Sequence, residues 1–115
     1  MKTNGMLQES AQVKIRVTVP QPHLAAVQTA LAEAGAGSIG SYTHCSFSHP
    51  VTGRFLPGEG SNPTVGNVGK IEEVDEVLIE AVCHKDHIEA VYHAVVLAHP
   101  YEEPAIDIIP RFDIK

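Results

Sequence analysis

Two segments of the chain carry the same pattern of apolar residues, and this repeat constrains the fold more than any other feature. Residues 24–34 and 88–98 each place apolar side chains at helical spacing. A shift of 64 positions aligns Leu24 with Ile88, Val27 with Val91, Ala30 with Ala94, Leu31 with Val95 and Ala34 with Ala98. Each segment also follows a strand-like stretch and precedes another. Two β-α-β units predict an α+β, ferredoxin-like βαββαβ fold, with both helices on one face of an antiparallel sheet.

The strands are predicted from shorter patterns. Val13, Ile15, Val17 and Val19 alternate with polar residues, and this period of two is typical of a strand with one buried face. Further β structure is expected over residues 38–48, 70–82 and 105–109.

Residues 49–69 contain eight glycines or prolines, which predicts a long Gly/Pro-rich β excursion with turns. The segment Arg54-Phe55-Leu56 is expected to form a short strand inside this excursion.

The length of 115 residues fits a single domain with one core. Residues 1–11 are polar and aperiodic, so we expect a flexible N-terminal tail followed by a single domain over residues 12–115. The start of the chain lacks the apolar region of a signal peptide, and no apolar run is long enough to span a membrane.

Charge and cysteine content limit the partners. The formal net charge is −6 and the basic residues are scattered, which argues against nucleic acid and against anionic membrane surfaces. Cys45 and Cys83 are too few for a disulfide framework, so we expect reduced thiols in a cytoplasmic protein. The stretch Val77-Leu78-Ile79 would be apolar on both sides of a strand, and the sheet face without helices is therefore expected to self-associate.

Several longer motifs resemble the YqfO (NIF-three-like) family. They are GAGSIGSYTHCSF at residues 35–47, GRFLPGEGSNP at 53–63, VGNVGKIEEV at 65–74 and HPYEEPA at 99–105. Together with the segments between them, these motifs extend the resemblance over residues 13–110.

The resemblance implies a CutA-like insert domain. In long family members, this module resembles an insertion in a metal-dependent domain whose His, Asp and Glu motifs are missing from this chain. The hydrolase or cyclohydrolase chemistry proposed for the family therefore has no residue here to carry it. The ending at residues 99–101 also resembles CutA, which is related in fold to the PII signal transducers, and this implies a homotrimer with clefts between subunits.

Candidate metal ligands are sparse. His44, Cys45 and His49 form the densest set, and thiolate and imidazole suit zinc or copper(I). His44 and Cys45 are adjacent, however, so on a strand they would point to opposite faces. The metal candidates are His44, Cys45 and His99, and the cofactor stays unidentified, with a divalent metal ion as the open option.

The link at residues 99–104 is the more specific feature. Its structural role would be a helix stop, with His99 in the last turn, where a protonated imidazole favours the negative end of the helix. Its functional role would be a cleft wall, with Tyr101 as a flat surface and the carboxylates as acceptors. The ligand-cleft candidates are His44, His99, Tyr101, Glu102 and Glu103.

These observations predict a non-catalytic, trimeric binding or regulatory module that holds a small ligand or metal ion at intersubunit clefts. No residue is predicted to be catalytic. Two alternatives remain open. One is a small metal-dependent enzyme with an intersubunit site built from His44, His99 and Glu102 or Glu103; the other is a purely structural oligomerisation unit.

Overall fold

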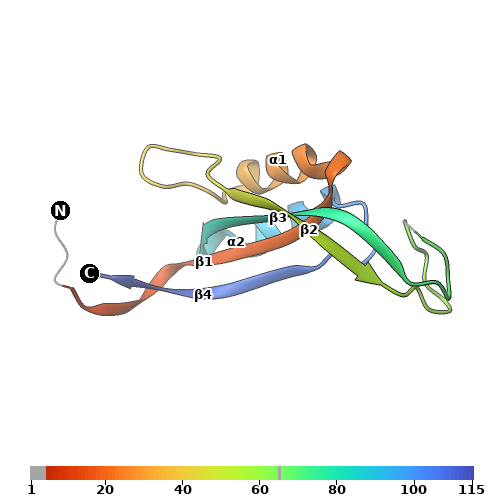
Figure 1. The fold of residues 1–115 in the computed structure, drawn as a ribbon. Helices are drawn as coiled ribbons and strands as arrows, with labels where there is room; N and C mark the ends of the chain where they lie inside the picture. The colour runs from red at the N-terminus through yellow and green to blue at the C-terminus, as the bar shows by residue number, and fades with distance from the viewer. Residues whose placement is uncertain (1–4, 65) are drawn as a thin grey trace.

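Four strands form one antiparallel sheet, and two helices pack against one of its faces (Figure 1). The computed structural model describes residues 5–64 and 66–115. The strands, in the spatial order β2-β3-β1-β4, are β1 (Leu7–Pro20), β2 (Phe47–Phe55), β3 (Glu72–His84) and β4 (Ile106–Ile114). The helices are α1 (Leu24–Ala34) and α2 (Ile88–Ala98), preceded by the short 3-10 turns η1 (Gln21–His23) and η2 (Lys85–His87). The predicted ferredoxin-like βαββαβ fold is confirmed.

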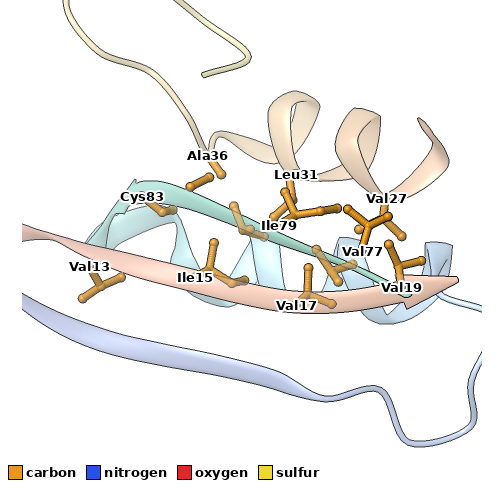
Figure 2. Close-up of a cluster of buried hydrophobic side chains, with 13 residues drawn as sticks. Val13, Ile15, Val17, Val19, Val27, Leu31, Ala36, Val77, Ile79 and Cys83 are labelled. Atoms are coloured by element: carbon orange, nitrogen blue, oxygen red, sulfur yellow. The ribbon is translucent and has the colours of Figure 1, made fainter. Parts of the chain in front are cut away.

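The core lies between the helices and the two central strands. Because side chains alternate along a strand, every second residue of β1 and β3 points toward the helices. Figure 2 shows these side chains meeting those of the helices. The buried set comprises Val13, Ile15, Val17, Val19, Val77, Ile79, Ala81 and Cys83 from the strands, Val27, Leu31, Val91 and Val95 from the helices, and Ala36.

The helix ends follow local rules. Pro22 stands in η1, where its fixed φ and missing N–H are tolerated before α1. Gly35 follows α1 with φ +120°, and its N–H is donated to the carbonyls of Ala32 and Leu31. Gly37 has φ +78°, and a Cβ there would collide with the backbone of Cys45. Glycine is therefore required where the chain leaves the helix.

Residues 38–46 form a loop, so the prediction of β structure over residues 38–48 was wrong for most of its length. An isolated bridge joins Ile39 and Tyr42, whose side chains are both exposed. Aromatic and β-branched residues suggested a strand, but strand propensity depends on packing against neighbours. The strand β2 begins at Phe47 and continues to Phe55. The short strand expected at residues 54–56 is therefore the end of this longer strand, which includes residues 54 and 55.

The outer ends of β1 and β4 form a two-stranded ribbon. Leu7 pairs with Ile114, Gln8 with Asp113 and Glu9 with Phe112, and the register shifts before Val13. The expectation of a tail over residues 1–11 was therefore wrong from Leu7 onward, because backbone pairing to β4 needs no alternation of side chains. Residues 1–4 of that expected tail lie outside the described residues.

The edge strands β2 and β4 carry Pro50 and Pro110 near their centres. Cys45 and Cys83 are free, and burial raises the pKa of the Cys83 thiol. No helix in the described ranges is long and apolar enough to cross a membrane.

A matched pair of truncations tests the core. Ile79 is 0% exposed and Leu97 is 87% exposed. We expect Ile79→Ala to lower the free energy of unfolding by about 2–5 kcal/mol, because it removes buried contacts and leaves a cavity. Leu97→Ala should change it by less than about 0.5 kcal/mol. Urea unfolding followed by circular dichroism measures both, and equal losses would contradict this packing.

Candidate functional site

A cavity of about 690 Å³ lies on the sheet face opposite the helices. We call that face the open face and this cavity the open-face pocket. All four strands contribute to it, together with the loop after β2 and the link after α2. Its lining includes Thr18, Gly53, Phe55, Glu76, Leu78 and Tyr101. Glu102, Glu103 and Asp107 also line it.

Strand register explains which side chains reach the open face. Thr18 pairs with Leu78, so both project from the same side of the sheet, opposite to the core residues Val17 and Ile79. Leu78 is buried at the base of the pocket.

Ion pairs make the open face more polar than the sequence suggested. The guanidinium Nε of Arg16 lies 2.8 Å from Oε1 of Glu80, and Nζ of Lys14 lies 3.7 Å from Oε2 of the same carboxylate. The expected apolar face was therefore wrong in its centre, because cross-strand pairing brings opposite charges together there.

The loop after β2 is tied to the link after α2. The backbone N–H of Asn62 donates to Oε1 of Glu102 at 2.9 Å, and the Thr64 hydroxyl donates to the Pro100 carbonyl at 2.7 Å. The rings of Phe55 and Tyr101 lie with centroids 6.4 Å apart. The structure therefore brings the candidates Tyr101, Glu102 and Glu103 together at one pocket.

His99 has no ring nitrogen left for a ligand. The residue is 7% exposed, and its Nε2 lies 2.6 Å from the Thr18 carbonyl oxygen. Its Nδ1 accepts the backbone N–H of Tyr101 at 3.1 Å. This pattern makes Nε2 the donor and Nδ1 the acceptor. The helix α2 does end here, with His99 as its C-cap, as the helix-stop role predicted. The ring in addition fastens the start of the link to the end of β1.

His44 and Cys45 lie elsewhere. They line a separate cavity of about 320 Å³ beside α1. The loop that carries them and the link after α2 lie at opposite ends of the sheet (Figure 1). His44 is exposed, has φ +61°, and pairs through Nδ1 with the Thr43 hydroxyl at 3.0 Å. The expected placement of both residues on a strand was wrong.

One chain therefore does not by itself bring together the residues considered for a small enzyme. His44 and Glu102 line different cavities, and His99 lines neither of them. Within residues 5–64 and 66–115, no three His, Cys, Asp or Glu side chains are close enough to hold a metal ion.

Glu76 is the residue that sequence reasoning missed. Only 8% of it is exposed, and its Oε2 has no hydrogen-bond partner among the described residues. The Tyr101 hydroxyl is close enough to interact with this carboxylate, but not with the geometry of a full hydrogen bond. Burial, then hydrogen bonding toward Glu76 and the negative charge of its carboxylate, raise the pKa of Tyr101. The alternation of side chains along β3 could have identified Glu76. The core residues of this strand have odd numbers, so a residue at position 76 projects onto the open face, as Leu78 does.

Comparison with known proteins places the chain by sequence. No family model matches it. A Mycobacterium leprae protein named GTP cyclohydrolase 1 type 2 homolog is 52% identical over 92 residues, which are 80% of this chain and 24% of that protein. A Bacillus subtilis protein of the same name is 46% identical over 97 residues. The chain is a homologue of one segment of the YqfO/NIF3 family. It spans about a quarter of the length of these relatives.

Solved structures agree with this relationship. A NIF3-related protein from Bacillus cereus superposes with a TM-score of 0.78 and 41% identity, over 95% of this chain and 27% of that protein. CutA from Archaeoglobus fulgidus matches at a TM-score of 0.64 and 22% identity, over 87% of this chain and 83% of that one. Bacillus subtilis GlnK, solved with ATP, matches at a TM-score of 0.59 and 13% identity, over 87% of this chain and 81% of that one. The CutA and GlnK matches establish the fold of this YqfO/NIF3 homologue.

The two hydrogen bonds of His99 predict a structural phenotype. His99→Ala leaves the Thr18 carbonyl and the Tyr101 N–H without partners, so we expect it to lower the free energy of unfolding by more than about 2 kcal/mol. His93→Ala, at an exposed site on α2, should change it by about 0.5 kcal/mol or less. Denaturant titration compares the two. A stable His99→Ala protein would show that these bonds contribute little.

Tyr101 predicts a loss of stability in alkali. Its raised pKa keeps the phenol protonated in the folded state, whereas the unfolded chain releases the proton above its ordinary pKa of about 10. The unfolding free energy should therefore fall as pH rises beyond about 10. Tyr101→Phe should reduce that fall, and Tyr92→Phe on α2 should leave it as in the wild type. Unfolding curves between pH 9 and 11 measure the slopes; identical slopes for all three proteins would contradict the prediction.

Proposed function

We propose that the chain is a non-catalytic binding or regulatory module that takes a small ligand in the open-face pocket. The observation that carries this proposal is the buried, unpartnered Glu76 oxygen inside a cavity of about 690 Å³. That volume is typical of small-molecule sites. Tyr101, Glu102 and Glu103, which the sequence nominated for a ligand cleft, line the same cavity.

The module is proposed to act as a homotrimer whose subunits border the ligand clefts. The resemblance to CutA supports this arrangement. Large apolar side chains also remain exposed near the ends of the strands, as Phe47 on β2 and Phe112 on β4 show. Exposed apolar surface of this kind favours burial against another protein surface. A cytoplasmic location with reduced thiols is part of the same proposal.

The activity in the relatives' name is not assigned to this chain. The match covers about a quarter of those proteins, and the described residues hold no cluster of three metal-ligating side chains. His44 and Glu102 line different cavities of one chain, so the alternative of a small enzyme would need two subunits to bring them together. The alternative of a purely structural oligomerisation unit would leave the buried carboxylate of Glu76 without a purpose.

Self-association and ligand retention can be measured together. We expect sedimentation velocity at micromolar concentration to show a trimer, and native mass spectrometry to detect a retained small molecule. A monodisperse monomer would contradict the intersubunit clefts. A trimer that retains nothing and binds no compound in a metabolite screen would instead support the structural unit.

A further inference from the structure

The carboxylate of Glu76 lacks a positive partner. Within residues 5–64 and 66–115, the lysine and arginine side chains that form ion pairs do so with carboxylates other than Glu76. These carboxylates are Glu80, Glu73, Glu72, Glu9 and Asp113. A buried anion without a counter-charge is unfavourable, so the site is electrostatically incomplete as it stands.

The rest of the pocket adds to the negative charge. Glu102, Glu103 and Asp107 line it, and the two guanidinium groups that reach it are already paired. Arg16 pairs with Glu80, and Arg54 pairs with Glu73 at 3.0 Å. A ligand entering this field is attracted if it is cationic and repelled if it carries phosphate or carboxylate groups.

The walls favour an organic ligand. Val51, Phe55, Leu56 and Leu78 supply apolar surface, and the tilted rings of Phe55 and Tyr101 form an aromatic corner. Aromatic faces bind cations and planar groups favourably. The described acids do not converge as metal ligands do. The pocket therefore suits a charged nitrogen group on an apolar body better than a bare metal ion.

Gly53 provides room for the buried carboxylate. It lies on β2, next to β3, and a Cβ built on it would collide with Oε1 of Glu76. The absence of a side chain at this position lets the Glu76 carboxylate lie against the strand. This steric observation does not depend on the charges around the pocket, and it concerns the same Glu76 carboxylate.

We propose that the open-face pocket binds an organic cation, an amine, amidine or guanidine on an apolar or aromatic body, with Glu76 as the anion that receives its charge. The Tyr101 hydroxyl accepts a second hydrogen bond from the same nitrogen group. The proposal rests on the binding function proposed above and specifies the ligand class. It adds Glu76, which lies outside the link at residues 99–104, as the residue that determines specificity.

Three probes with one ring test the charge preference. Benzamidine is cationic, benzamide is neutral and benzoate is anionic. Titration calorimetry with the 115-residue chain should detect benzamidine binding, weaker benzamide binding and no benzoate binding. Glu76→Gln keeps the shape of the side chain and should weaken benzamidine binding tenfold or more, while Tyr101→Phe should weaken it a few-fold.

Asp75→Asn is the matched control, because Asp75 lies on the same strand, is exposed and does not line the pocket, and no ion pair in the described residues joins it to a pocket arginine. It should leave benzamidine affinity unchanged. Urea unfolding of Glu76→Gln provides a second readout, and its midpoint should be equal to that of the wild type or higher, because an uncompensated charge has been removed.

The outcomes separate this inference from the proposed function. Equal benzamidine affinity of the wild type and Glu76→Gln, or tighter binding of benzoate, would overturn the organic-cation assignment. A different retained molecule in the native mass spectrum would then leave the binding function standing. If no probe binds and no molecule is retained, both proposals fail.

Discussion

Burial of one face of β1 and β3 beneath the two helices is the constraint on which the rest of the structure depends. Val17 and Ile79 fill that face, so their neighbours Thr18 and Leu78 must project to the other side. A slip of one residue would exchange the two sets and place charges in the core. The same alternation that forms the core therefore selects the side chains that form the floor of the open-face pocket.

The roof of the pocket has a different origin. The loop after β2 has few apolar side chains that could fix it, and its position depends on hydrogen bonds to the link after α2. His99 holds the beginning of that link to the end of β1. A chain of contacts thus connects the central strand, the link and the loop. A ligand that touched Tyr101 would therefore act on three segments far apart in the sequence.

Long periodic segments were predictable, and isolated positions were not. The helix patterns identified α1 and α2, because a stripe of apolar residues repeating at helical spacing has few other solutions. The sequence also placed Tyr101, Glu102 and Glu103 at one site, because they are adjacent in the chain. It could not place Glu76 beside Tyr101, because that contact depends on sheet register. Likewise, no local signal distinguished the buried His99 from an exposed helix-end histidine.

The prolines at the sheet edges have a consequence for growth of the sheet. Pro50 and Pro110 each remove a backbone donor from an outer strand, at positions where a further strand would need a continuous row of hydrogen bonds. Edge-to-edge addition, the route to open-ended fibrils, is thereby opposed on both sides. Contact between side-chain surfaces is not opposed in this way, and assemblies formed through such surfaces can close on themselves at a fixed size.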